Sequence, residues 1–332
     1  MRNLIRAIGL ISVLFYFPDM GTGAPFAYIT NLEDNTVSVI DTASNDVKTV
    51  QVGTRPKGVA VHPDGSRVYV ANSIDHTVSV INTASNTAIA AVAVGNSPEG
   101  VAVNADGSRA YVTSNGDSTV SVIDTASNTV IARVVVGRFP LGAAIQPNGS
   151  RVYVANAMDN TVSVINTASN TVIATVPVES FPYGAAVHSD GSRVYVTNRN
   201  SNTMSIINTA SNTVVGTVEV GVWPIGVAVH GNGSRVYVTN SLDNTLSVID
   251  TASNTVVRWV GVGISPGGVA VHPDGKLVYV ANTGSNTITL IATAPSFPLG
   301  TVAVGRRPFA FGHFIGPGVV PSAAAPQRLQ LR

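Results

Sequence analysis

A single 42-residue period organises almost the whole chain. Tyrosines mark it: Tyr69, Tyr111, Tyr153, Tyr195, Tyr237 and Tyr279 stand 42 residues apart, and Tyr28 precedes Tyr69 by 41. A fixed period of this size is typical of repeat proteins, in which each copy is one small structural unit that packs against its neighbours. The chain therefore contains seven copies of one unit.

The internal pattern of a copy indicates four β-strands. The copy that begins at Gly58 reads GVAVHP, the turn DGS, RVYVANS, a short polar link, TVSVINTA, the turn SN and finally TAIAAVAVG. Each apolar piece is short, rich in Val, Ile, Thr and Tyr, and bounded by turn residues. Four strands in about 40 residues are typical of a β-propeller blade, whereas a helical solenoid needs apolar residues at a spacing of 3.6.

The two ends of the chain indicate a closed ring. The first copy begins at Phe26, in the second strand of the unit, and the segment PFAFGHF from Pro308 to Phe314 matches the strand that opens each unit. The two termini thus contribute strands to the same blade. Such sharing closes a ring, whereas an open solenoid does not require it. We predict an all-β fold: a seven-bladed β-propeller of four-stranded antiparallel blades, with the ring closed by the C-terminal strand joining the N-terminal blade.

The repeat resembles a known family. Tyr-Val-Thr-Asn or Tyr-Val-Ala-Asn recurs, for example at Tyr195–Asn198, and is followed by a segment similar to Asp-Asn-Thr-Val-Ser-Val-Ile-Asp-Thr. These motifs are similar to the YVTN-family β-propeller repeat, which occurs in archaeal surface-layer proteins and in exported bacterial proteins. The resemblance implies the propeller fold and a location outside the cytoplasm, but it implies no single activity.

The termini and the composition set further expectations. Residues 1–24, with an apolar run from Ala7 to Phe17, resemble a secretory signal peptide; residues 25–317 form the propeller, and 318–332 are expected to be a flexible C-terminal tail. We therefore expect a secreted, periplasmic or cell-surface protein with no transmembrane anchor after signal cleavage. The chain has no cysteine, so packing alone stabilises it, and its net charge of +1 gives no general attraction to nucleic acid or membranes.

The repeats differ from one another mainly on one side of the predicted ring. The links from the second to the third strand and from one blade to the next open on one face, and the residues around the repeated proline vary there. This face is rich in basic and aromatic side chains for a weakly charged chain, with Glu99 as the acidic exception. The candidate ligand-binding residues are Arg55, Lys57, Arg138, Phe139, Phe181, Tyr183, Trp223, Arg306, Arg307 and Phe309.

Two interpretations of this face remain open. Aromatic rings stack on sugars, bases or exposed side chains, and arginine pairs with phosphate or carboxylate, so the face suits binding of an envelope protein, a glycan or another anionic ligand. Alternatively, the aromatic residues fill gaps between blades and the arginines keep the face soluble. Binding of single-stranded nucleic acid is a further possibility that the sequence does not favour.

Other recurring polar residues fit structural roles. His62, His188, His230 and His272 are equivalent to one another, but Asn104 and Gln146 replace them in other copies, which suggests hydrogen bonding at a strand end. Asp34, Asp75, Asp117, Asp159 and Asp243 recur at a tight link where aspartate commonly binds backbone amides.

These patterns lead to a prediction about function. No catalytic motif, metal site or cofactor site is predicted, and the expected function is a binding or cell-envelope scaffold module rather than an enzyme. An enzyme of the propeller lactonase type is the alternative, and it requires a carboxylate or histidine cluster at the central channel that lies outside the repeat.

Overall fold

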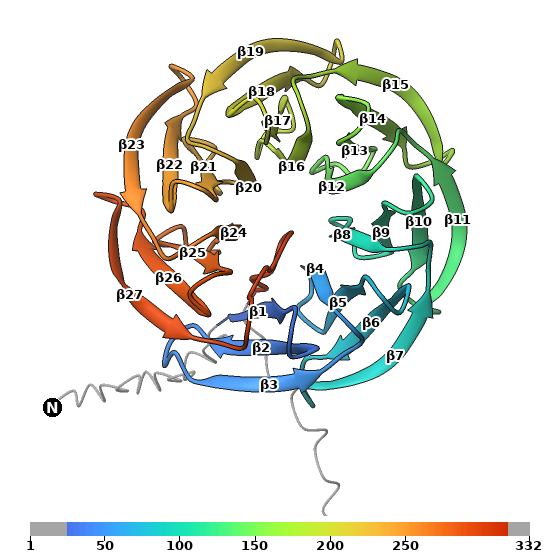
Figure 1. Ribbon diagram of the computed structural model, residues 1–332. Helices are drawn as coiled ribbons and strands as arrows, with labels where there is room; N and C mark the ends of the chain where they lie inside the picture. The colour runs from blue at the N-terminus through green and yellow to red at the C-terminus, as the bar shows by residue number, and fades with distance from the viewer. Residues whose placement is uncertain (1–24, 318–332) are drawn as a thin grey trace, which may run out of the picture.

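The computed structural model describes residues 25–317, which form seven blades around a central channel (Figure 1). Blade 1 contains β1 (Phe26–Asn31), β2 (Thr36–Asp41) and β3 (Val47–Gln51). Blade 2 contains β4 (Pro56–Val61), β5 (Arg67–Asn72), β6 (Thr77–Asn82) and β7 (Thr87–Ala93), and blade 3 contains β8 (Pro98–Val103), β9 (Arg109–Ser114), β10 (Thr119–Asp124) and β11 (Thr129–Val135). The predicted fold class is confirmed.

The remaining four blades repeat the same order from the channel outwards. Blade 4 contains β12 (Pro140–Ile145), β13 (Arg151–Asn156), β14 (Thr161–Asn166) and β15 (Thr171–Pro177); blade 5 contains β16 (Pro182–Val187), β17 (Arg193–Asn198), β18 (Thr203–Asn208) and β19 (Thr213–Glu219). Blade 6 contains β20 (Pro224–Val229), β21 (Arg235–Asn240), β22 (Thr245–Asp250) and β23 (Thr255–Gly261), and blade 7 contains β24 (Pro266–Val271), β25 (Leu277–Asn282), β26 (Thr287–Ala292) and β27 (Phe297–Ala303). All described pairs of neighbouring strands within a blade are antiparallel.

Burial explains the composition of the strands. The two middle strands of each blade lie between neighbouring blades, so residues on both faces are buried, and β13 is buried along its length apart from Arg151. The outermost strand has one face in solvent, and β15 accordingly alternates between exposed and less exposed residues. The repeated tyrosines lie between the blades, where Tyr153 is 0% exposed.

Turn residues adopt the backbone geometry that their types favour. The glycine of each Asp-Gly or Asn-Gly turn has a left-handed φ of 72–77°, and the asparagine of each Ser-Asn turn has a left-handed φ of 52–64°. Glycine reaches this region without strain, and asparagine is enriched there. These hairpins lie together on one face of the ring, which we call the turn face. The opposite face carries the links between blades, and we call it the link face.

The blades approach one another most closely around the channel. A Cβ atom on Gly142 would lie 2.5 Å from the carbonyl oxygen of Tyr183 in the next blade, and a Cβ on Gly184 would lie 2.4 Å from the carbonyl oxygen of Ile225. No side chain fits at these distances. Glycine at the third position of β12 and of β16 therefore allows the inner strands of neighbouring blades to approach each other. Further from the channel, Arg109 donates a hydrogen bond from Nη1 to the carbonyl oxygen of Thr167 in blade 4, at 2.6 Å.

The C-terminal segment completes blade 1, as predicted, but it does so irregularly. Asn31 pairs with Pro308 and Ala27 pairs with Ile315 in isolated antiparallel bridges, and the Tyr28 amide donates to the Phe314 carbonyl at 2.8 Å. No continuous strand is formed between these points. In Figure 1 this segment, drawn in red, runs beside β1 and reaches the channel.

The described residues contain strands and turns, and no helix in this part of the chain is long and apolar enough to span a bilayer. The predicted signal peptide at 1–24 and the predicted flexible tail at 318–332 lie outside the described residues.

Candidate functional site

The predicted variable residues all lie on the link face, in seven loops of similar geometry. The residue before each proline has a left-handed φ, from 49° at Ser97 to 58° at Phe139. This conformation costs a non-glycine residue about 1–2 kcal/mol, and it is unusual for bulky side chains. All seven loops adopt this left-handed conformation although the residue type differs. The backbone geometry of the loop, and not the individual side chain, therefore determines the conformation.

Side chains of two blades hold six of the seven loops in place, and in the loop that enters blade 4 the bond to Asp159 is the one observed among the described residues. In the loop that enters blade 6, the Val222 amide donates to Asp243 Oδ2 at 2.6 Å, and the Trp223 amide donates to Asn202 Oδ1 of blade 5 at 3.1 Å. The recurring aspartates therefore bind backbone amides, as the sequence predicts. With its backbone fixed at both sides, the residue before the proline is free to differ from blade to blade.

The ten candidate residues divide into two rings. Residues before the proline or one position earlier form an outer ring: Arg55, Arg138, Trp223, Arg306 and Arg307 are exposed, and Phe139 and Phe181 are partly buried. Residues after the proline begin the inner strands at the mouth of the channel, where Lys57, Tyr183 and Phe309 are partly buried. The sequence placed all of them on one face, and the structure separates them by distance from the channel.

The expectation that Glu99 alone opposes the basic residues was wrong. Arg138 pairs with Asp159 and Arg306 pairs with Asp34, each at 2.6 Å between Nε and Oδ1, and Arg307 Nη1 lies 3.4 Å from Glu33 Oε1. The physical reason is the loop framework: an aspartate that binds the amide of an arginine is also within reach of its guanidinium. The pairing lowers the pKa of Asp34, through hydrogen bonds from the backbone and then the side chain of Arg306. Most of the predicted positive charge is thereby compensated.

Aromatic residues of neighbouring blades form a continuous group. The ring centroids of Phe139 and Phe181 are 6.3 Å apart, and the guanidinium carbon of Arg199 lies 3.8 Å from the Trp223 ring centroid and 5.4 Å from that of Phe181. Such stacking of a guanidinium on an indole is a favourable cation–π contact. We call Phe139, Phe181, Arg199 and Trp223 the aromatic patch.

Arg199 was missed by sequence reasoning, although a signal existed. It follows the conserved asparagine of the second strand, at a position that holds a small, polar or apolar residue in every other copy: Leu32, Ser73, Asn115, Ala157, Ser241 and Thr283. Its Nε is buried and has no hydrogen-bond partner in the described part of the chain. Comparison of the copies at this link would have identified it.

A second polar group lies at the mouth of the channel. Glu99 is 4% exposed, forms an ion pair with Lys57 Nζ and accepts a hydrogen bond from Asn115 Nδ2 at 2.8 Å. Burial raises the pKa of the Glu99 carboxyl above its ordinary value, although Lys57 favours the charged form. Burial also raises the pKa of the nearby Tyr183 hydroxyl, and the Glu99 charge adds to this effect.

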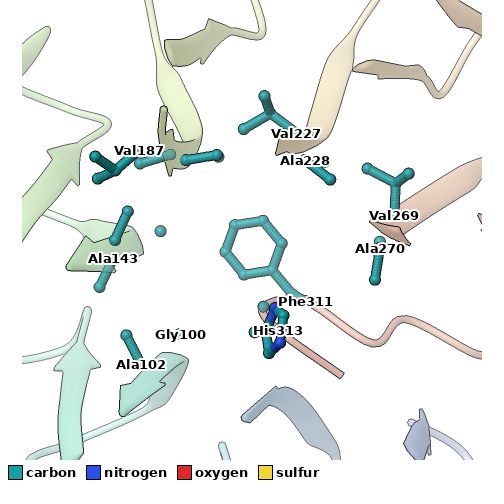
Figure 2. A pocket seen from close by; sticks show the side chains of 18 of the residues that line it. Gly100, Ala102, Ala143, Val187, Val227, Ala228, Val269, Ala270, Phe311 and His313 are labelled. Atoms are coloured by element: carbon teal, nitrogen blue, oxygen red, sulfur yellow. The ribbon is translucent and has the colours of Figure 1, made fainter. Parts of the chain in front are cut away.

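The channel itself contains a cavity of about 300 Å³ (Figure 2). Small side chains from the inner strands β8, β12, β16, β20 and β24 line it, together with Phe311, Gly312 and His313 of the closing segment. Neither Phe311 nor His313 was a candidate from the sequence, because their segment was recognised there only as the missing strand.

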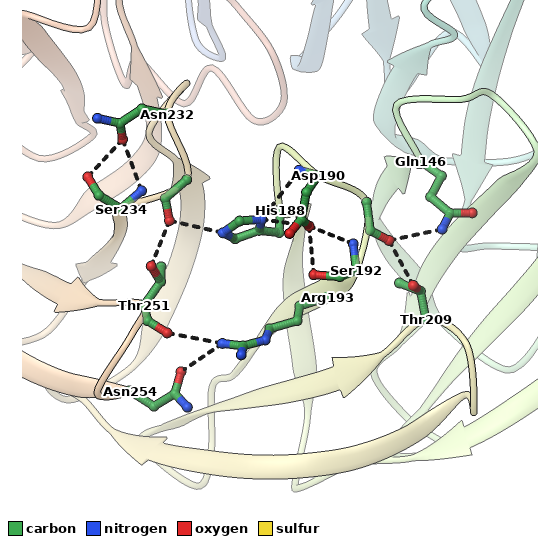
Figure 3. A network of polar contacts seen from close by, with 12 residues as sticks. Gln146, His188, Asp190, Ser192, Arg193, Thr209, Asn232, Ser234, Thr251 and Asn254 are labelled. Carbon is green, nitrogen blue, oxygen red and sulfur yellow. Dashed lines mark hydrogen bonds and ion pairs between the residues drawn. The ribbon is translucent and has the colours of Figure 1, made fainter.

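The repeated histidines join neighbouring blades (Figure 3). His188 Nε2 donates to the carbonyl oxygen of Gly233 at 3.0 Å, and Gln146 Nε2 donates to that of Gly191 at 3.0 Å, so the two residue types perform the same role. This confirms the predicted hydrogen bonding at the strand ends. Within residues 25–317, no group of three or more His, Cys, Asp or Glu side chains is arranged to hold a metal ion.

Comparisons with known proteins place the chain among β-propellers. The model of the YNCE-like beta-propeller family matches residues 142–235 and 225–303, and that of the Lactonase, 7-bladed beta-propeller family matches residues 14–176. No curated protein matches the sequence.

Many solved structures match this chain, and two of them illustrate the shared fold. A structure titled hydrazine synthase from Kuenenia stuttgartiensis has a TM-score of 0.75 and 24% sequence identity, covering 83% of this chain and 94% of that chain. A functionally unknown protein from Desulfotomaculum acetoxidans has a TM-score of 0.76 and 18% identity, covering 86% and 99%. Structure and comparisons agree that this chain is a seven-bladed propeller similar to the YNCE-like and lactonase propeller families.

Proposed function

We propose that the protein is an exported binding module of the cell envelope and that the aromatic patch is its contact surface for a glycan with acidic groups. The observation that carries this proposal is the convergence of Arg199 with Phe181 and Trp223, all at positions where the repeat is broken. Residues that only fill gaps between blades have no need of an exposed ring, and Trp223 is 38% exposed. The export component rests on residues 1–24, whose sequence resembles a secretory signal peptide.

The chemistry of the patch favours a glycan over nucleic acid. The faces of Trp and Phe rings stack on the C–H faces of sugars, and a guanidinium donates hydrogen bonds to hydroxyl and carboxylate oxygens. A strand of nucleic acid needs a track of uncompensated positive charge. On the link face, Arg138, Arg306 and Arg307 are already paired with carboxylates.

The chain offers a direct optical test. It contains two tryptophans, Trp223 in the patch and the exposed Trp259 on the outer strand β23, so Trp259→Phe leaves Trp223 as the single reporter. Addition of purified acidic envelope polysaccharide is expected to change the Trp223 fluorescence saturably. In the same background, Arg199→Gln is expected to weaken binding about tenfold, the loss of one charged hydrogen bond, whereas Arg258→Gln on the outer strand is the matched control.

Two results would contradict the proposal. One is the absence of any fluorescence change with polysaccharide, and the other is an equal effect of Arg199→Gln and Arg258→Gln. Binding of oligodeoxythymidine with a steep dependence on salt would instead support the nucleic-acid alternative.

A lactonase-type enzyme is the second candidate, and Glu99 is the observation that favours it. The family match over 14–176 includes this residue. Glu99 is a buried carboxylate at the channel mouth, at a position where no other copy of the repeat has an acidic residue. A carboxyl group with a raised pKa can act as a general base on water in the opening of a lactone. Hydrolysis of dihydrocoumarin by the parent, lost in Glu99→Gln and retained in Arg199→Gln, would establish this activity; no hydrolysis by the parent would exclude it for this substrate.

A further inference from the structure

The closing segment is longer than the strand it replaces. Pro56 and Val61 mark the ends of β4, an inner strand of the repeat, and pair with Asn72 and Val68, with five residue steps between them and one register shift after Pro56. The equivalent residues of the closing segment are Pro308 and Ile315, with seven steps between them. The segment therefore contains two extra residues, which form a bulge.

The bulge directs side chains into the channel. Ala310 and Gly312 have left-handed φ values of 46° and 127°, and the backbone is held against blade 2 because the Val59 and Val61 amides donate to the carbonyls of Phe311 and His313 at 3.0 and 3.1 Å. As a result, Phe311 and His313 lie at the cavity, where the other blades present only Gly, Ala, Val and Ile145 (Figure 2). Bulges commonly re-aim side chains beside functional sites.

Aromatic rings narrow the cavity towards the link face, and a second pocket adjoins it towards the turn face. The Phe311 ring packs edge-on against Tyr183 at a centroid distance of 5.4 Å and lies 6.0 Å from Phe309, so three aromatic rings occupy the link-face end. At the other end, His313 also lines an opening of about 440 Å³ that is bordered by Pro63 and Pro147 near the hairpin turns. A ligand can therefore enter without crossing the aromatic patch.

The lining determines what such a ligand can be. His313 is the one ionisable side chain among the residues that line the cavity, whose other lining residues are Gly, Ala, Val, Ile145 and Phe311. Solvent reaches it inside the channel, and desolvation by the surrounding protein lowers its pKa, which favours the neutral imidazole. The lining side chains supply no countercharge for an ion; Phe311 and the valines offer apolar contact, and the backbone of the inner strands supplies the polar part of the lining.

We propose that the channel binds a small uncharged ring compound carrying one hydroxyl or carbonyl group, with the ring against Phe311 and the polar group hydrogen-bonded to His313. Its size follows from the volume: an apolar cavity of about 150 Å³ holds benzene, so about 300 Å³ accommodates a bicyclic compound. This site is separate from the aromatic patch and does not depend on the proposed function.

Calorimetric titration with three related compounds tests the proposal. 2-Naphthol is expected to bind with one site per chain, naphthalene about five- to tenfold more weakly for want of the hydrogen bond, and 2-naphthoate not measurably. His313→Leu is expected to abolish the preference for naphthol over naphthalene. Ala228→Leu fills the cavity from β20 and is expected to abolish binding of both, whereas Ala91→Leu, the same change on the exposed face of β7, is expected to leave binding unchanged.

Circular dichroism shows that each variant is folded before it is titrated. Failure of the parent to bind 2-naphthol, or undiminished binding by a folded Ala228→Leu variant, would overturn the channel as the site. An unchanged preference for naphthol in His313→Leu would overturn the role of His313. Parent-like binding by Trp223→Ala supports the independence of this site from the aromatic patch, and loss of binding in that variant would refute it.

Discussion

Blade 3 lacks a buried amide that the six other blades share, and restoring it is expected to stabilise the protein. The conserved asparagine of the second strand donates two hydrogen bonds from Nδ2 to hydroxyls of the third strand, at 2.8–3.1 Å, in every case: Asn31, Asn72, Asn156, Asn198, Asn240 and Asn282. Ser114 occupies this position in blade 3. Its hydroxyl and that of Ser121 are buried without a partner in the described residues.

The space for the larger side chain already exists. A Cβ on Gly137 would lie 2.7 Å from the amide of Asn156, and Gly95 stands in the same relation to Ser114, so the glycine that accommodates the amide is present in blade 3. Ser114→Asn adds two hydrogen bonds of about 1 kcal/mol each, orders one further side-chain torsion and buries an amide oxygen, which accepts a backbone hydrogen bond in Asn240 and Asn282 but has no partner in the other four asparagines; the net gain in the free energy of unfolding is therefore about 1 kcal/mol.

Urea unfolding followed by circular dichroism measures this gain, which should appear as a higher midpoint at an unchanged slope. The reverse change, Asn156→Ser in blade 4, serves as the matched control and is expected to cost a similar amount. If Ser114→Asn leaves the midpoint unchanged or lowers it while Asn156→Ser destabilises, the two hydrogen bonds are not the source of the stabilisation and the reasoning is refuted.

Three further predictions concern the contacts between blades and their turns. Gly142→Ala places a Cβ 2.5 Å from a carbonyl oxygen of the next blade and is expected to cost at least about 2 kcal/mol, seen in the urea midpoint; a neutral effect would contradict the close approach of the inner strands. His188→Gln preserves the hydrogen bond that Gln146 makes in blade 4 and should change stability by less than about 0.5 kcal/mol, whereas His188→Ala should cost about 1 kcal/mol; equal effects would refute this role. Hydrogen bonds from Ser192 lower the pKa of Asp190 to about 2, below the value of about 3.9 in unfolded chains, so its contribution to stability is complete above pH 4 and is lost as the pH falls towards 2; Asp190→Asn should flatten the thermal-stability profile in that window, and an unchanged profile would contradict the assignment.

The fold was predictable because each blade repeats the same physical solution. Alternating apolar residues, Asp-Gly and Ser-Asn turns and a split first blade specify the strand number and the closure of the ring without reference to long-range contacts. The two extra residues of the closing segment were not predictable in the same way. The amino-acid sequence of this segment resembles that of an inner strand from Pro308 onwards. The two extra residues are evident only from the pairing of Ile315 with Ala27.

The candidate face was predictable, but its chemistry was only partly so. Variation between copies correctly identified the loops, because the framework of aspartate and asparagine side chains fixes the backbone and leaves the side chain before the proline unconstrained. The same framework places a carboxylate beside Arg138 and Arg306, and a one-dimensional comparison of copies cannot show that pairing. Charge counted along the sequence therefore overestimated the positive charge available to a ligand.

Departures from a repeat are informative only when their surroundings are known. Ser114 departs from the pattern and leaves two unpaired hydroxyls, which suggests a local loss of stability and no function. Arg199 departs from it and meets two aromatic rings of neighbouring blades, and Phe311 and His313 depart from it together inside one cavity. Independent drift has no reason to bring unusual residues together. Spatial clustering therefore distinguishes departures that indicate a binding site, such as Phe311 and His313, from an isolated departure such as Ser114. This criterion selects the aromatic patch and the channel as the two places where binding should be sought.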